Sequence, residues 1–244
     1  MLLAIDAGNT RTKWAVFETN VLVEGGGIHK DEFQYSLTTI LQKYPLLQHA
    51  IFPSVSHLDA GELKFLENSL QVVVVDRKAP FPFKNLYQTP ETLGIDRMIL
   101  ASAAVLKYPS VHRLVIDAGT CITYDYVDNQ DQYYGGAISP GLQMRYNAMH
   151  QFTAKLPQLE LAEQVPLVGQ DTAHAMHSGV VHGVVGEIEY MIQNILADKE
   201  NFTIILTGGD AEFLAKRLKS IIFAHSNFLL EGLNHYFYFL QSHA

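Results

Sequence analysis

Two similar segments constrain the fold of this chain more than any other feature. LLAIDAGNTRTKW occupies residues 2–14, and LVIDAGTCITYDY occupies residues 114–126. Each is an apolar strand that ends in Asp-Ala-Gly, followed by hydroxyl side chains and a second apolar run. One copy is typical of an ordinary hairpin, in which Gly relieves a tight turn. Two copies favour a duplicated fold, with a cleft for a polar ligand where its two units meet.

Strands and helices alternate after each copy, which is the pattern of a layered α/β sheet. The first half predicts strands over LLAID, TRTKWAVFE, NVLVEGG, HAIFPSV and QVVVVD, with helices over residues 31–43 and 58–69. The proline-rich residues 77–92 predict a loop, and a helix over residues 94–107 follows it.

The second half repeats the strand-turn-strand opening. It predicts strands over RLVID, CITYDYV, QYYGGAI, FTIILT and NFLL. Helices are expected from Pro140, over residues 171–198 and 210–219, and at the C-terminus. We therefore expect two domains, residues 1–108 and residues 109–244.

Composition argues against several classes of protein. Of the 244 residues, 48% are hydrophobic, which supports a sizeable core and argues against disorder. The net charge of -8 and the lack of a basic run argue against a nucleic-acid binder. The single cysteine, Cys121, cannot form an intramolecular disulfide and fits a reducing compartment. Asp6 interrupts the N-terminal apolar stretch, and no apolar run is as long as a membrane span, so we expect a soluble cytoplasmic protein.

The first turn has the residue types of a phosphate site. Asp6 ends a strand, and Gly8 allows a close approach of the backbone to a ligand. Backbone N–H groups, with the side chains of Asn9 and Thr10, form a cradle for a polyanion. Lys13 supplies a point charge for a terminal phosphate, and Asp6 suits a divalent metal that bridges phosphates. The alternative is a surface hairpin with a solvated lysine.

The second turn repeats this pattern with Asp117, Gly119 and Thr120. Two carboxylates at equivalent strand ends repel each other unless cations or donors lie between them. The sequence TGGD at residues 207–210 places two glycines between a strand and a helix, which is a usual place for a nucleotide. Strand-Gly-Gly-helix junctions are also common without a ligand, and the chain has neither a P-loop nor a Gly-x-Gly-x-x-Gly motif.

The motif LGIDR at residues 93–97 places an aspartate and an arginine at the start of a helix. Asp96 and Arg97 suit a general base and an anchor for an anion. The alternative is an ordinary helix N-terminus with a favourable Asp.

Together these motifs resemble the type III pantothenate kinases, of the acetate and sugar kinase/Hsc70/actin superfamily. The matching segments, in chain order, are DAGNTRTK, YQTPETLGIDR, DAGT, GGAISPGL, DTAHAMHSGVVHG, TGG and LLEGL. The resemblance covers nearly the whole chain. It implies a duplicated ribonuclease H-like fold, as in actin-like ATPases, with ATP bound in the central cleft. It also implies ATP-dependent phosphorylation of pantothenate to 4'-phosphopantothenate, the first step of coenzyme A biosynthesis, by a homodimer.

The resemblance carries site roles over to individual residues. Asp96 corresponds to the general base that takes the proton from the pantothenate hydroxyl. The residues implied for ATP are Asp6, Ala7, Gly8, Asn9, Thr10, Arg11, Thr12, Lys13, Thr120, Gly208 and Gly209. The residues implied for pantothenate are Tyr87, Gly94, Ile95, Arg97 and Thr172. Asp117 corresponds to the position that holds a monovalent cation, K⁺ or NH₄⁺, and Asp6 is expected to serve a divalent cation, Mg²⁺.

One position departs from the family pattern, because Cys121 stands where the family commonly has Ala. Two other functions remain open from the sequence. One is a related transcriptional activator without kinase activity. The other is a different small-molecule kinase or a phosphatase of the same superfamily. LGIDR and the upstream Tyr87 discriminate between them, because the shared fold requires only the Asp-Gly turns.

Overall fold

The computed structural model describes residues 1–8, 11–220 and 222–243. It contains two compact units. The first consists of Met1–Lys84, Gln88–Lys107 and Asn227–Ala244, and the second of Asn85–Tyr87 and Tyr108–Ser226. The chain thus enters the second unit briefly at residues 85–87 and returns to the first unit for its last segment.

The first unit is built on a five-stranded sheet with the order β3-β2-β1-β4-β5. Its strands are β1 (Leu2–Ala7), β2 (Arg11–Glu18), β3 (Val21–His29), β4 (His49–Pro53) and β5 (Gln71–Val75). β1 is antiparallel to β2 and parallel to β4, so β1 and β4 end at the same edge of the sheet. The Asp6 and Gly8 turn begins at this edge.

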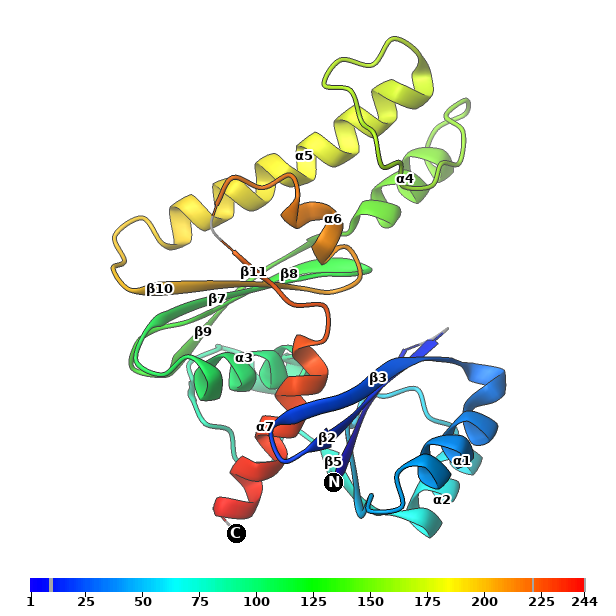
Figure 1. Ribbon diagram of the computed structural model, residues 1–244. Coiled ribbons are helices and arrows are strands. Elements are labelled where there is room, and N and C mark those ends of the chain that lie inside the picture. The colour runs from blue at the N-terminus through cyan, green and yellow to red at the C-terminus, as the bar shows by residue number, and fades with distance from the viewer. Residues whose placement is uncertain (9–10, 221, 244) are drawn as a thin grey trace. The chain divides into compact units, whose positions relative to one another are not determined.

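Helices cover both faces of this sheet (Figure 1). They are α1 (Phe33–Lys43), α2 (Ala60–Ser69), α3 (Ile95–Lys107) and α7 (Phe228–Ser242), with short 3₁₀ turns at Lys30–Glu32 and Pro90–Thr92. Leu3 and Ile5 of β1 share a buried cluster with Leu37 of α1 and Leu66 of α2. On the other side, α7 packs against β1, β2 and β4, and α3 packs against α7. These contacts bury the apolar stripe of each helix.

The second unit repeats the same strand order and adds one strand at its edge. Its order is β11-β10-β7-β8-β9-β6. The strands are β6 (Lys84–Asn85), β7 (His112–Ala118), β8 (Cys121–Val127), β9 (Gln132–Pro140), β10 (Phe202–Thr207) and β11 (Phe223–Ala224). β7, β8, β9, β10 and β11 take the places of β1, β2, β3, β4 and β5. The duplication expected from the two Asp-Ala-Gly segments is therefore confirmed.

The described residues of the second unit form the helices α4 (Leu142–Gln151), α5 (Thr172–Ile195) and α6 (Ala211–Ala215). α5 lies along one face of the sheet (Figure 1), where Val184 and Ile188 share a buried cluster with Ile116 and Leu206. Across the described ranges of the chain, no helix, α5 included, has both the length and the apolar character needed to cross a membrane.

The C-terminal region differs from the sequence-based expectation. NFLL was expected to be a strand, but α7 begins at Phe228, and the strand of this region is β11 at Phe223–Ala224. The prediction was wrong because a short apolar run has no distinguishing period, whereas the buried Leu230, Leu233 and Phe237 lie at helical spacing. The helix expected over residues 210–219 is shorter, Ala211–Ala215. The domain limits 1–108 and 109–244 stay a prediction.

Candidate functional site

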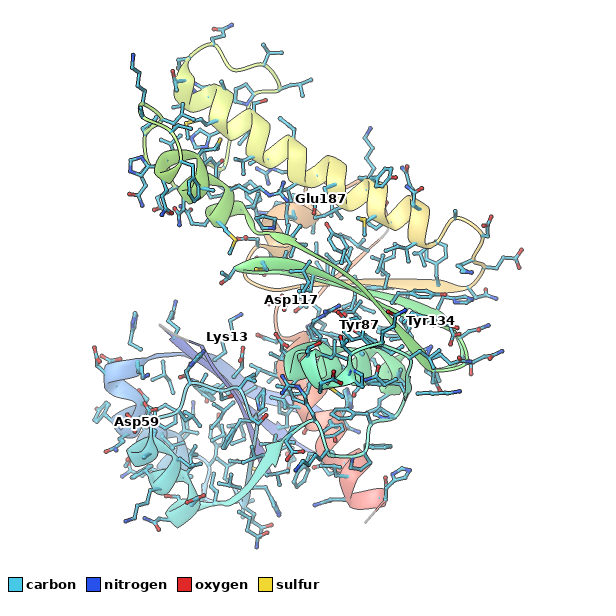
Figure 2. The ribbon with its side chains drawn as sticks, turned by 180° about the vertical axis from the view of Figure 1, so that it is seen from behind. Lys13, Asp59, Tyr87, Asp117, Tyr134 and Glu187 are labelled. Carbon is cyan, nitrogen blue, oxygen red and sulfur yellow. The ribbon has the colours of Figure 1, made fainter. Side chains whose placement is uncertain are left out.

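Asp6 and Lys13 lie directly opposite each other on β1 and β2. Directly opposed residues of an antiparallel pair project on the same face, so the carboxylate and the ammonium group are neighbours. Lys13 is exposed and Asp6 is half-buried. Figure 2 shows Lys13 near the end of the paired strands. The edge of the first sheet therefore presents one anionic and one cationic group together.

Burial raises the pKa of Asp6 above its ordinary value. The positive charge of Lys13 acts in the opposite direction, and the negative charge of Asp96 raises the pKa further. Asp96 belongs to the same compact unit, so the structure brings the two carboxylates close enough to interact. A cation bound beside Asp6 would offset both the burial and the repulsion.

The rest of the first turn divides between the two faces of the sheet. Gly8 donates its N–H to the carbonyl oxygen of Arg11 at 3.1 Å, which closes the turn. Ala7 and Thr12 are buried, on the opposite face from Asp6 and Lys13. The guanidinium of Arg11 lies on β3, because a Cβ atom at Gly27 would be 2.9 Å from its Nη2.

Not every residue implied for ATP in this segment therefore shares a face with Lys13. Asn9 and Thr10, also expected at this site, lie outside the described residues.

Asp96 stands at the start of α3, between two buried neighbours. Ile95 is fully buried and Arg97 is 6% exposed, whereas Asp96 is exposed. Oδ1 of Asp96 accepts the backbone N–H of Arg97 at 2.9 Å. A Cβ atom at Gly94 would lie only 2.4 Å from the same oxygen. The glycine and the helix start thus determine where this carboxylate lies.

The approach to α3 is held by a long side chain. Arg77 donates from Nε to the carbonyl oxygen of Leu93 at 2.7 Å, and Leu93 is buried. Because the segment before Asp96 is anchored in this way, the backbone that carries the carboxylate is rigid, which favours precise placement of that carboxylate.

Three turns of the second unit meet around Asp117, at the end of β7. Asp117 is aligned with Thr207, at the end of the parallel strand β10. Gly208 has a φ of +96°, and a Cβ atom there would lie 2.3 Å from the Ala118 oxygen and 2.5 Å from Oδ1 of Asp117. Only glycine fits this position, so TGG has a definite structural task here.

The third turn follows β9. Gly141 donates its N–H to the carbonyl oxygen of Thr120 at 3.0 Å, and a Cβ atom at Gly141 would be 2.2 Å from the Gly119 oxygen. Thr120 is exposed, and a Cβ atom at Gly209 would have nothing within 4 Å. The second Asp-Ala-Gly turn is thus packed tightly against its neighbours but open around Thr120 and Gly209.

Two residues near these turns were not singled out from the sequence. Asp210 donates its N–H to the Ala118 carbonyl oxygen at 3.0 Å, and burial raises the pKa of its carboxyl group. Gly141 is required by the close approach described above. The signals for them were present, since Asp210 completes TGGD and Gly141 follows Pro140 at the end of β9.

The residues expected at the pantothenate site fall in both compact units. Gly94, Ile95 and Arg97 belong to the first unit, beside Asp96. Tyr87 belongs to the second unit, at the β6 edge of the sheet, as labelled in Figure 2. Thr172 is the exposed first residue of α5, next to the N-cap Asp171.

The donor chemistry fits cations bound together with a ligand. Within the described ranges, no group of three or more His, Cys, Asp or Glu side chains could hold a metal ion by itself. Asp6 and Asp117 each offer a single carboxylate, which suits a hard cation whose other ligands are phosphate oxygens and water. The arrangement can neutralise phosphates, hold an anion and accept a proton at Asp96.

Comparison with known proteins gives consistent matches. A family model described as type III pantothenate kinase matches residues 2–194. A type III pantothenate kinase of Flavobacterium psychrophilum is 50% identical over 234 residues, which cover 96% of this chain and 97% of that protein.

Two solved structures resemble the chain in fold. A protein assigned to the Baf family of transcriptional activators, from Campylobacter jejuni, has a TM-score of 0.63 at 21% identity, covering 99% of this chain and 98% of the other. A protein assigned as an N-acetylmannosamine kinase, from Listeria monocytogenes, has a TM-score of 0.53 at 13% identity, covering 100% and 99%. At these identities the likeness concerns the fold alone, and it confirms the duplicated ribonuclease H-like architecture.

Proposed function

Because the chain belongs to the type III pantothenate kinase family, it phosphorylates pantothenate on the way to coenzyme A, and we propose how its residues share this task. Asp96 is the general base. Lys13 neutralises the phosphates of ATP, with Asp6 beside it for Mg²⁺. Arg97 binds the anionic end of pantothenate.

The geometry of Asp96 carries this proposal. Its Oδ1 is engaged by the Arg97 N–H, and among the described residues Oδ2 accepts no hydrogen bond. Oδ2 takes the proton of the pantothenate hydroxyl while the hydroxyl oxygen forms its bond to the γ-phosphorus of ATP. The bond from the γ-phosphorus to the bridging oxygen breaks, and ADP leaves with the electron pair. Such a transfer depends mainly on alignment and charge neutralisation, which Asp96 and Lys13 supply.

Cations complete the neutralisation. Asp6 would hold Mg²⁺, which would balance charge on the phosphates, and the raised pKa of the buried Asp6 supports a cation there. Asp117 would hold the monovalent cation, K⁺ or NH₄⁺, and the family resemblance of its turn supports this assignment. Thr120, Gly208 and Gly209 contact ATP from the second unit, supported by the open surroundings of Thr120 and Gly209.

We propose that Tyr87, Gly94, Ile95 and Thr172 contact pantothenate in addition to Arg97. Arg97 is supported as the anion anchor by its burial at the start of α3, since a guanidinium binds a carboxylate through a paired geometry. We also propose a cytoplasmic homodimer. The family resemblance supports the dimer, and the free Cys121 supports a reducing compartment.

A coupled assay of ADP release across a panel of small alcohols tests the function directly. Turnover is expected with pantothenate and to require Mg²⁺ and a monovalent cation. Turnover of another alcohol without turnover of pantothenate would exclude the proposed substrate. A transcriptional activator without kinase activity would show no pantothenate-dependent ADP release at all.

A further inference from the structure

Tyr87 reaches the outer edge of the second sheet through a short strand. β6 lies beside β9, and the backbone N–H of Leu86 donates to the carbonyl oxygen of Tyr133 at 2.9 Å. The backbone N–H of Tyr87 donates to Oδ1 of Asn85 at 2.9 Å. These two hydrogen bonds hold the backbone that carries the Tyr87 ring.

The ring itself lies on a glycine. Gly135 of β9 has a φ of +94°, in the range that side-chain-bearing residues rarely adopt. A Cβ atom at Gly135 would lie 2.6 Å from Cδ2 and 2.8 Å from Cε2 of Tyr87. Real Cβ atoms essentially never approach other heavy atoms closer than 3.0 Å, so any side chain at residue 135 displaces the ring.

The ring of a buried tyrosine, Tyr133, lies beside the Tyr87 ring. The rings of Tyr87 and Tyr133 have centroids 6.3 Å apart and are tilted by 55°. Tyr133 is fully buried and donates its hydroxyl to Oδ1 of the buried Asp125 at 2.5 Å. Because this hydrogen bond holds Tyr133, the Tyr87 ring cannot retreat in that direction without disturbing the core.

We propose that Gly135 is a positioning residue for pantothenate binding, because its lack of a side chain sets the depth at which the Tyr87 ring lies against β9. The inference rests on the proposed function, in which Tyr87 contacts pantothenate. Tyr87 is half-buried, so the ring is seated on the sheet yet still presents surface to a ligand. A larger residue at position 135 pushes the ring outward and misplaces that contact.

A double-mutant cycle tests this with Gly135→Ala, Tyr87→Ala and the combined variant. Gly135→Ala is expected to raise the KM for pantothenate by roughly tenfold, since misplacement by about 1 Å can cost up to a hundredfold. The KM for ATP should not change. In the Tyr87→Ala background, Gly135→Ala should have no further effect on the KM for pantothenate, because the displaced ring is absent.

The cycle separates ring displacement from backbone strain. An alanine at a φ of +94° is strained in either background, so the loss of thermal stability should persist in the combined variant. Tyr87→Phe keeps the ring and should preserve the effect of Gly135→Ala. Gly186→Ala on α5 is the control, because a Cβ atom there has nothing within 4 Å. If Gly135→Ala alone fails to fold, recovery of folding in the combined variant supports the ring clash, whereas failure of both variants to fold assigns the loss to backbone strain and contradicts the positioning role.

The outcomes distinguish the inference from the function on which it rests. If Tyr87→Ala raises the KM for pantothenate but Gly135→Ala does not, the positioning role is wrong and the contact stands. An equal effect of Gly135→Ala with and without the ring also overturns it. If Tyr87→Ala leaves the KM for pantothenate unchanged while pantothenate is turned over, Tyr87 is not a substrate contact, and the inference falls with that assignment.

Discussion

Gly94 and Asp96 are coupled by contact: a Cβ atom on Gly94 would lie 2.4 Å from Oδ1 of Asp96. The same oxygen accepts the Arg97 N–H, so the carboxylate is held from two sides. The backbone at Gly94 lies outside the left-handed region and suits any residue, which leaves the carboxylate as the reason for glycine.

Gly94→Ala should therefore reorient Asp96 while the fold is retained. We expect kcat to fall roughly ten- to a hundredfold, because misplacement of a catalytic group by about 1 Å has a cost of this order. Steady-state kinetics and thermal unfolding, measured together, check this. Gly186→Ala serves as the control, and a Gly94→Ala variant with normal kcat would show that the position of Oδ1 is unimportant.

Asp96→Asn should remove the base without loss of stability, because the side chain is exposed. The expected loss in kcat is about 10²- to 10⁴-fold, the usual contribution of a general base. Asp31→Asn is a matched control, since Asp31 is an exposed carboxylate in the first turn of a 3₁₀ helix of the same unit. Pantothenate-dependent ADP release near the wild-type rate in Asp96→Asn would refute the assignment.

Lys13→Ala should weaken the use of ATP more than the binding of pantothenate. The lysine is exposed beside Asp6, and removing its charge leaves the phosphates less neutralised. The KM for ATP is the quantity to measure, with the exposed Lys64→Ala on α2 as the control. Equal ATP kinetics in both variants would exclude Lys13 from the phosphate site.

Asp6→Asn should raise stability at neutral pH while it impairs catalysis. The pKa of Asp6 in the folded state lies above its value in the unfolded chain, mainly because of burial. The folded state therefore binds a proton at Asp6 more tightly than the unfolded state does. The wild-type protein therefore loses stability as pH rises from the unfolded pKa through the folded one, and Asp6→Asn does not.

Thermal unfolding across pH checks this prediction. The Tm of Asp6→Asn should exceed that of the wild type at pH 7, and this difference should vanish below the ordinary pKa of Asp. In a chain of this size, each kcal/mol of stability corresponds to about 2–4 °C in Tm. A variant with a lower Tm than wild type at pH 7 would contradict the prediction.

Glu187→Gln should destabilise the second unit. Glu187 projects from α5 toward the sheet (Figure 2) and accepts from Ser139 at 2.5 Å, from Arg145 at 2.6 Å and from Tyr124 at 2.9 Å. Burial acts to raise its pKa, but the hydrogen bonds outweigh burial and lower it. This contribution to stability is therefore present above the unfolded pKa and is lost as pH falls through the folded pKa.

We expect a loss of about 2 kcal/mol at pH 7, typical of hydrogen bonds to a charged group. Denaturant unfolding at pH 7 and at acidic pH measures it, with the difference between variant and wild type shrinking at acidic pH. Glu212→Gln, on the exposed side of α6, is the control. Equal stability of Glu187→Gln and wild type at pH 7 would show that the three hydrogen bonds to Glu187 do not stabilise the second unit.

The sequence predicts the duplication well because each Asp-Ala-Gly strand has a strong local pattern. The apolar residues of β1 and β7 and the glycines after them are local features, and both sheets follow from them. Side-chain direction is less accessible. A strand alternates its side chains, so within the first turn Thr12 is buried while Lys13 is exposed, and Arg11 lies on β3.

Contacts between distant segments were the hardest to predict. Gly135 and Tyr87 are separated by the whole of α3, β7 and β8, and nothing local in either segment shows that the ring lies on the glycine. The packing of α7 on β1 is a distant contact of the same kind, because residues 228–242 meet residues 2–7.

That packing has a consequence for biosynthesis. A nascent chain usually folds unit by unit from its N-terminus as the ribosome releases it. Here the sheet of the first unit receives one of its covering helices, α7, from residues that are translated after the whole of the second unit, so one face stays uncovered until α7 has been made. The second unit, whose segments after residue 107 are contiguous, can complete its core first. The order of folding is thus expected to run against the order of translation.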